Sequence, residues 1–156
     1  MTAVANLFET PRDPQGDAPP GYQVPLARIG PLIGASALGL TVYELAEGQS
    51  ICPYHYEYPC EEWVIVLEGV PTLRTPEGES ELEPGDVVGF APGPAGAHKL
   101  TNRRDAPALV AMLSTKSRPA VAVYPDSDKL GVAVGEDEAL LLFPRAAAVG
   151  YWDGEA

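Results

Sequence analysis

Glycine and proline interrupt this chain so frequently that long helices are excluded. The two residue types occupy 33 of the 156 positions, as 16 glycines and 17 prolines. The longest stretch without either, Ala108 to Arg118, has only 11 residues. A helical bundle or coiled coil needs longer uninterrupted segments, and a membrane-spanning helix needs about 20 apolar residues. The sequence therefore predicts neither class, while its apolar content of 46% is ordinary for a globular core.

Short segments of β-forming residues, separated by turn residues, predict an all-β fold. Ten such segments follow one another: Leu38–Leu45, Trp63–Leu67, Thr72–Thr75, Ser80–Glu83, Asp86–Phe90, Ala97–Asn102, Leu109–Ser114, Ala120–Tyr124, Lys129–Val134 and Ala139–Phe143. Strands of this length at near-regular spacing indicate an antiparallel sandwich or barrel. We expect one domain over residues 26–156, including a C-terminal tail. Five prolines within residues 1–25 predict an extended N-terminal arm that packs on this domain.

The chain carries a large excess of acidic residues, 22 against 10 basic ones, for a formal net charge of −12. Nucleic acids and anionic membranes are bound mainly through Lys and Arg, so this charge predicts neither as a partner. The first twenty residues lack a basic cluster followed by an apolar run, and two cysteines are too few for a disulfide framework. We therefore expect a cytoplasmic protein.

The residues that point to chemistry begin in the stretch from residue 48 to residue 69. Side chains alternate between the two faces of a strand, so His55 and Glu57 project from the same face. Glu62 follows five residues after Glu57, at the start of the next predicted strand. If the two strands pair as a hairpin, Glu62 returns to the face of His55 and Glu57.

The second histidine of the chain, His98, opens a predicted strand after a loop rich in Gly and Pro. A lone histidine in a β-protein is more often structural than a metal ligand. Here, both histidines combine with two carboxylates, and His nitrogen with carboxylate oxygen suits Zn, Fe(II), Mn or Ni. Without a cation, Glu57 and Glu62 would repel each other inside a barrel, which favours a bound divalent metal.

Two stretches of this sequence resemble the two motifs of the cupin superfamily, namely Gly48…His55-x-Glu57-x4-Glu62-x6-Gly69 and Gly85…His98-x3-Asn102. The resemblance implies a double-stranded β-helix, or jelly-roll barrel, with one divalent metal at its centre. It also implies that the ligands are His55, the residue at position 57, Glu62 and His98. The family usually has a second histidine where this chain has Glu57, and the Pro-Gly before His98 is slightly out of register.

The expected function is metal-dependent chemistry on a small oxygenated organic molecule. With Fe(II), two histidines and one carboxylate leave positions for O₂ and substrate, as in a dioxygenase. With Zn or Mn, the metal would act as a Lewis acid in an isomerase or epimerase, and an unligated Glu57 would be the catalytic proton shuttle. The alternative is a non-catalytic module that binds a metal or a small molecule.

Two further groups of residues have less specific interpretations. A stripe of aromatic residues on the face opposite His55 (Tyr54, Tyr56, Tyr58) predicts packing under the N-terminal arm or against a second subunit, and hence a homodimer. Half of the positive charge lies on five residues, Lys99, Arg103, Arg104, Lys116 and Arg118. A solvated hairpin end is favoured for these residues over a rim that binds anions.

Overall fold

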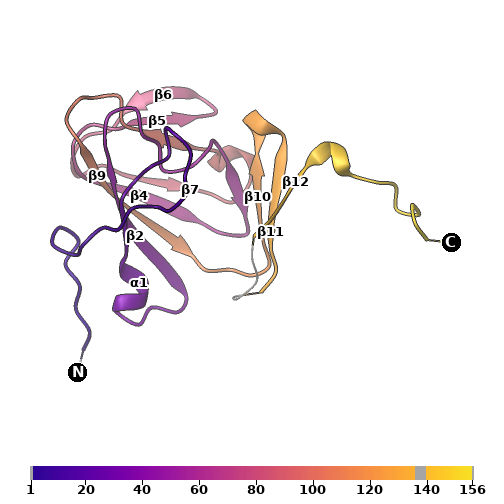
Figure 1. The fold of residues 1–156 in the computed structure, drawn as a ribbon, viewed down its shortest axis with the longest axis horizontal. Helices are drawn as coiled ribbons and strands as arrows, with labels where there is room; N and C mark the ends of the chain where they lie inside the picture. The colour runs from indigo at the N-terminus through magenta and orange to yellow at the C-terminus, as the bar shows by residue number, and fades with distance from the viewer. Residues whose placement is uncertain (1, 136–139, 156) are drawn as a thin grey trace.

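A computed structural model describes residues 2–135 and 140–155, and β-strands dominate this part of the chain (Figure 1). The strands are β1 (Leu26–Arg28), β2 (Leu38–Leu45), β3 (Tyr56–Tyr58), β4 (Glu62–Glu68), β5 (Thr72–Thr75), β6 (Gly78–Glu81), β7 (Val87–Phe90), β8 (Lys99–Thr101), β9 (Ala108–Thr115), β10 (Ala120–Tyr124), β11 (Lys129–Ala133) and β12 (Leu141–Pro144). The helical elements are one turn of α-helix, α1 (Ile29–Leu32), and three 3₁₀ turns, η1 (Pro94–Gly96), η2 (Pro125–Ser127) and η3 (Arg145–Ala147).

The strands form two facing antiparallel layers. One layer is a sheet with the order β1-β2-β9-β4-β7. The other consists of a sheet with the order β6-β5-β8 and a sheet with the order β12-β11-β10-β3. Isolated bridges between Ser50 and Thr101 and between His55 and His98 join these two sheets edge to edge. The all-β, jelly-roll prediction is therefore confirmed, and three of the predicted strand ranges coincide with β2, β5 and β10.

The core lies between the layers and follows from the alternation of side chains along each strand. Its buried members are Val24, Leu45, Ile51, Val64, Val66, Leu73, Leu82, Phe90, Leu100 and Val110. A second apolar cluster covers the outer face of the first layer, where Ala5 and Leu7 of the N-terminal segment pack against Ile29 and Val42. The barrel is thus closed by apolar contacts on both faces of the sheet that carries β4.

One expected strand pairing is wrong, and one expected strand is only partly described. β3 pairs with β10, whereas β4 pairs with β7 and β9, so the chain crosses from one layer to the other between Tyr58 and Glu62. The hairpin predicted for these two strands is therefore not formed. Ala139, the first residue of the last predicted strand, lies outside the described residues, and β12 occupies Leu141–Pro144.

The two ends of the chain differ in how they meet the barrel. Asp13 pairs with Leu26, and the Tyr22 hydroxyl accepts a hydrogen bond from the Lys99 ammonium at 3.2 Å. The C-terminal segment instead leaves the body after β12, as Figure 1 shows. Within the described residues, no helix has both the length and the apolar character needed to cross a membrane.

Two glycines near strand ends allow a matched test of how closely the backbone after β4 approaches the start of β9 in the same sheet. Both have positive φ, +75° at Gly48 and +80° at Gly69. A Cβ at Gly48 would meet no atom within 4 Å, whereas one at Gly69 would lie 2.6 Å from the backbone of Pro107 and Ala108. We expect Gly48→Ala to lower the free energy of unfolding by about 1 kcal/mol through backbone strain. Gly69→Ala should lower the free energy of unfolding by roughly 1–3 kcal/mol more than Gly48→Ala does, because the neighbouring backbone must also move. Equal losses in urea unfolding would contradict this account.

Candidate metal centre

His55 and His98 lie directly opposite each other on adjacent segments of one layer. The His55 amide donates to the His98 carbonyl at 3.1 Å, and the His98 amide donates to the His55 carbonyl at 2.8 Å. Residues paired in this way place their side chains on the same face of the sheet. The two imidazole rings accordingly have centroids 4.8 Å apart, and both residues are buried. The backbone thus brings together two histidines that lie 43 positions apart in the sequence.

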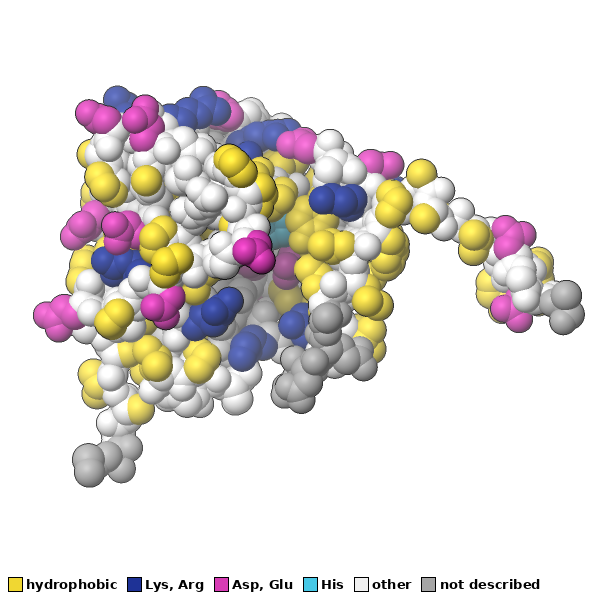
Figure 2. Space-filling view, viewed as in Figure 1, with side chains coloured by type: hydrophobic (Ala, Val, Ile, Leu, Met, Phe, Trp, Pro, Cys, Tyr) yellow, Lys and Arg dark blue, Asp and Glu magenta, His cyan; other side chains and the backbone are white. Residues whose placement is uncertain are grey.

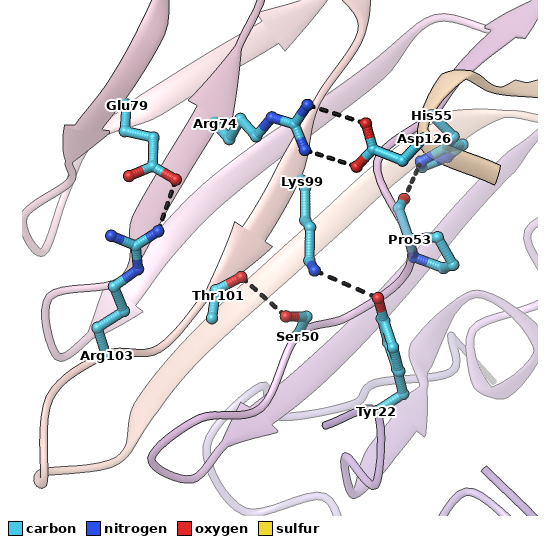
Figure 3. A network of polar contacts seen from close by, with 10 residues as sticks. All are labelled: Tyr22, Ser50, Pro53, His55, Arg74, Glu79, Lys99, Thr101, Arg103 and Asp126. Carbon is cyan, nitrogen blue, oxygen red and sulfur yellow. Dashed lines mark hydrogen bonds and ion pairs between the residues drawn. The ribbon is translucent and has the colours of Figure 1, made fainter. Parts of the chain in front are cut away.

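Each imidazole is held in one orientation by a backbone carbonyl. His55 Nδ1 donates to the Pro53 carbonyl at 3.0 Å (Figure 3), and His98 Nδ1 donates to the Gly96 carbonyl at 2.9 Å. Because a carbonyl only accepts, Nδ1 carries the proton in both rings and the Nε2 lone pair is free. The Phe90 ring stacks on His98 with centroids 3.7 Å apart, which fixes that ring further.

Glu62 reaches the histidines from the facing layer, on β4. Its Oε2 atom lies 3.8 Å from His55 Nε2 and 3.6 Å from His98 Nε2. The three ligand-type atoms all lie within 4.8 Å of one another. His98 Nε2 is buried and has no hydrogen-bond partner among the described residues. An orphaned nitrogen lone pair beside a carboxylate and a second lone pair is a donor set that fits a divalent cation.

Glu57, the fourth residue of the predicted site, stands slightly apart from this group. It lies on β3, and its Oε1 is 4.0 Å from His55 Nε2. Its side chain is 27% exposed, compared with 17% for Glu62, and it lines the adjoining cavity. The structure therefore clusters His55, Glu62 and His98 and leaves the Glu57 carboxylate at the edge of the cluster.

Burial disfavours charge on the clustered side chains when no cation compensates it. Burial, with a smaller contribution from Glu57, raises the pKa of the Glu62 carboxyl to about 7. Burial also lowers the pKa of His98 to about 4 and lowers that of His55, so both imidazoles are neutral near pH 7. Neutral imidazoles are the form that binds metal, and a cation would stabilise the ionised form of Glu62.

Neither cysteine belongs to the cluster. Cys52 Sγ approaches the Nδ1 side of His55 at 3.5 Å, and burial raises the pKa of this thiol to about 12. Cys60 Sγ lies 3.8 Å from the Ser117 carbonyl, which it faces as a weak donor. Both sulfurs are free thiols in the structure.

The tyrosine stripe does not form one exposed surface. Tyr54 is buried beneath Arg74, whose guanidinium carbon lies 3.9 Å from the ring centroid. Arg74 also pairs with Asp126 through two hydrogen bonds (Figure 3). Tyr56, which is half-buried, contacts Tyr58 edge to face, and Tyr58 is 44% exposed.

Two side chains that orient the imidazoles were not identified from the sequence. Phe90 pairs with Glu62 in the register of β4 and β7, and the Tyr124 ring stacks 5.8 Å from His55. The sequence analysis assigned both Phe90 and Tyr124 to strands. Their positions beside the site, however, depend on which strands pair with each other. Only the register, which short motifs do not encode, could have indicated these two residues.

The raised pKa of Glu62 predicts how pH affects the stability of protein freed of metal by a chelator. The folded state keeps the Glu62 proton up to about pH 7, whereas the unfolded chain loses it near 4.5. The stabilising contribution is therefore complete below pH 4.5 and is lost as the pH rises through 7, by roughly 3 kcal/mol.

Glu62→Gln, which has no charge at any pH, should lack this loss. His98 acts in the opposite direction, because its lowered pKa removes stability as the pH falls from 6.5 towards 4. Wild type and Glu62→Gln are therefore compared by urea unfolding at each pH. Both contain His98, so its contribution cancels in the difference between their free energies of unfolding. A stability difference between wild type and variant that is the same at pH 5 and pH 8 would contradict the prediction.

The comparisons with known proteins agree with this geometry. A family model described as a cupin domain matches residues 41–114, and this range includes all four predicted ligands, His55, Glu57, Glu62 and His98. No match was found among curated proteins.

Solved structures share the fold at low sequence identity. A sugar phosphate isomerase from Silicibacter pomeroyi has a TM-score of 0.81 and 24% identity, covering 96% of this chain and 98% of that one. A protein from Acidithiobacillus ferrooxidans has a TM-score of 0.77 and 24% identity over 84% and 82% of the two chains. The polyketide cyclase RemF from Streptomyces resistomycificus has a TM-score of 0.61 and 21% identity over 76% and 82%. Residues 41–114 of this chain therefore match a cupin-domain model, and the chain shares its fold with these solved structures.

Proposed function

We propose that His55, Glu62 and His98 hold one divalent metal ion, of Fe, Zn, Mn or Ni, and that the protein is a metal-dependent isomerase or epimerase. The metal assignment is supported by the free Nε2 lone pairs of both histidines, which face the Glu62 carboxylate from the opposite layer. A mixture of imidazole nitrogen and carboxylate oxygen suits these metals better than soft Cu(I). The substrate is a small oxygenated organic molecule that enters the adjoining cavity.

The observation that favours an isomerase is the position of Glu57. Its carboxylate lies 4.0 Å from His55 Nε2, outside the cluster of three donors, and it lines the cavity. A carboxylate beside a metal site, but not required by it, is placed to take up a proton and return it. A sugar phosphate isomerase and a polyketide cyclase share this fold, and proton transfer next to a carbonyl is consistent with the first of them.

The proposed mechanism assigns one role to each group. A bound Zn²⁺ or Mn²⁺ supplies Lewis-acid polarisation of a substrate carbonyl. Glu57 removes a proton from the carbon next to that carbonyl. In an isomerisation, this proton returns to the former carbonyl carbon and the adjacent hydroxyl proton moves to the former carbonyl oxygen; in an epimerisation, the opposite face of the same carbon takes up a proton. Substrate and product therefore contain the same atoms. The Pro53 and Gly96 carbonyls keep the histidine Nε2 atoms directed at the site, and Phe90 covers one face of His98.

A dioxygenase is the second candidate, because two histidines and one carboxylate are also the ligand set of non-haem Fe(II) oxygenases. Oxygen consumption by protein reconstituted anaerobically with Fe(II) separates this reaction from proton transfer. A non-catalytic binding module would hold metal or ligand without either activity.

The proposed function predicts that metal binding and catalysis can be separated by substitution. Purified His98→Ala and His55→Ala should lose stoichiometric metal, measured by elemental analysis, whereas Glu57→Gln should retain it. In D₂O, protein loaded with Zn or Mn should exchange the proton next to the carbonyl in a panel of aldose and ketose phosphates, as followed by NMR. Glu57→Gln should slow this exchange by roughly 100-fold or more.

The matched control is Glu61→Gln, which removes a neighbouring carboxylate that is exposed and accepts a hydrogen bond from the Trp63 indole at 2.7 Å. This variant should keep both metal and exchange. Full metal content in His98→Ala would reject the assigned site, and normal exchange in Glu57→Gln would reject the assigned proton shuttle.

We also infer that the protein is a homodimer in the cytoplasm. The tyrosine stripe gives little support to dimerisation, since Tyr54 is buried. Support comes from the last strand, β12, and from the segment that leaves the barrel after it (Figure 1), where large apolar side chains are 40–85% exposed. These side chains are Leu141, Leu142, Phe143, Val149, Tyr151 and Trp152. Exposed apolar surface of this kind marks a contact with another chain, and the two free thiols agree with a reducing compartment.

The dimer is tested by light scattering at micromolar concentration. Wild-type protein should have the mass of two chains, because the apolar C-terminal residues are buried only in the pair. A Tyr151→Ser, Trp152→Ser double variant should shift the equilibrium towards one chain without changing its metal content. A wild-type protein with the mass of one chain would contradict the inference.

A further inference from the structure

The cavity beside the proposed metal site joins two regions of opposite charge. It has a volume of about 640 Å³ and is lined by Glu57 and Glu62 on one side and by Arg28, Lys116 and Arg118 on the other. We call these three cations the basic rim. Figure 2 looks towards this hollow, with histidine and acidic side chains inside it and Lys and Arg side chains gathered along its lower edge.

The register of the first layer explains why the basic rim shares a cavity with Glu62. Arg28 pairs with Thr41 on β2, and Thr41 pairs with Met112 on β9, so these side chains share the inner face. Met112 in turn pairs with Val64, two residues after Glu62 on β4. Arg28 and Glu62 therefore face the same interior from strands three spacings apart, roughly 14 Å.

Lys116 and Arg118 follow from the end of β9. Ser114 pairs with Glu62, and alternation places Lys116, two residues later, on the same face as Ser114. The Lys116 amide donates to the Ala37 carbonyl at 2.9 Å, which continues the pairing of β9 with the segment before β2. Arg118 lies in the connection from β9 to β10 and reaches the same cavity.

The basic rim differs from the other cations of the chain in its partners. Five of the ten basic residues pair with carboxylates: Arg12, Arg74, Arg103, Arg104 and Arg145. Lys99 donates to the Tyr22 hydroxyl instead. Members of the basic rim form no ion pair with any residue in ranges 2–135 and 140–155. Three cations of a chain whose net charge is −12 thus line the same cavity.

Polar donors complete this end of the cavity. The hydroxyls of Ser36, Thr41, Ser114, Thr115 and Ser117 line it together with the basic rim. Arg guanidinium, Lys ammonium and hydroxyl groups are the donors that bind phosphate and carboxylate oxygens. The cavity volume of about 640 Å³ lies in the range that encloses small metabolites.

We propose that the basic rim binds the terminal oxyanion, phosphate or carboxylate, of a small substrate whose oxygenated carbon chain reaches the His55–Glu62–His98 cluster. This inference rests on the proposed function and adds the substrate class to it. The anionic group anchors one end of the molecule at the rim, while the carbonyl end lies beside Glu57. Of the five basic residues that the sequence analysis grouped together, Lys116 and Arg118 line the cavity, and Arg28 joins them there.

The test is isothermal titration calorimetry on Zn-loaded protein with inorganic phosphate, acetate, ribose 5-phosphate and uncharged ribose as probes. Wild type should bind at least one of the three anionic probes and bind ribose more weakly. An Arg28→Gln, Lys116→Gln, Arg118→Gln triple variant should bind that anion about tenfold more weakly or worse, because charged hydrogen bonds are lost. Preference for phosphate or for acetate identifies which oxyanion the site takes.

The matched control is Arg103→Gln, Arg104→Gln, which removes two surface cations paired with Glu79 and Glu81 and should leave binding unchanged. Circular dichroism and zinc content verify that the triple variant is folded and loaded. Equal anion affinity in wild type and triple variant, or no anion binding at millimolar concentration, overturns the proposal.

The same proteins separate this inference from the proposed function. Anion binding that depends on the basic rim, without exchange of any substrate proton, would reject the isomerase and retain the oxyanion site. Proton exchange that is equally fast in wild type and triple variant, for ribose 5-phosphate and for ribose, would retain the isomerase and reject the oxyanion site. Glu57→Gln should lose exchange and keep anion binding.

Discussion

The two backbone hydrogen bonds between His55 and His98 are the constraint on which the candidate site depends. They join the two sheets of one layer at a point where neither residue belongs to a long strand, and they place both imidazoles on the inner face. The facing layer then needs to contribute only one side chain, Glu62, to complete a group of three donors. Because the donors come from both layers, the site can form only when the layers are packed, so folding and site assembly are coupled.

The same packing makes the site costly when it holds no cation. Burial opposes the charge of Glu62 and the protonation of both histidines, and the Nε2 atom of His98 is buried without a hydrogen-bond partner among the described residues. Apolar neighbours such as Phe90 cannot compensate for these losses. A divalent cation would relieve all of them at once, because it accepts the imidazole lone pairs and stabilises the carboxylate. The structure therefore gives a physical reason for a metal that is independent of the motif.

Alternation along strands accounts for what the sequence could predict. It placed His55 and Glu57 on one face, and the motif spacing selected Glu62 and His98 as their partners. It could not select neighbouring strands, since many pairings satisfy the same alternation. The hairpin expected between β3 and β4 was wrong for this reason, although Glu62 reaches the site from the opposite layer. Arg28 was also missed, because its position beside the cavity depends on three successive strand registers.

The inner face of β9 shows how one strand serves both the core and the cavity. Along this face Val110 is fully buried, Met112 and Ser114 are half-buried, and Lys116 is exposed. Glu62 pairs with Ser114, at the step where the face changes from apolar to polar. The donor cluster thus lies at the boundary between an apolar core, which holds its geometry, and a cavity lined by polar and charged side chains. On the proposed function, a substrate would enter from the polar side, past Lys116, and its anionic end would remain there while the carbon chain reaches Glu57.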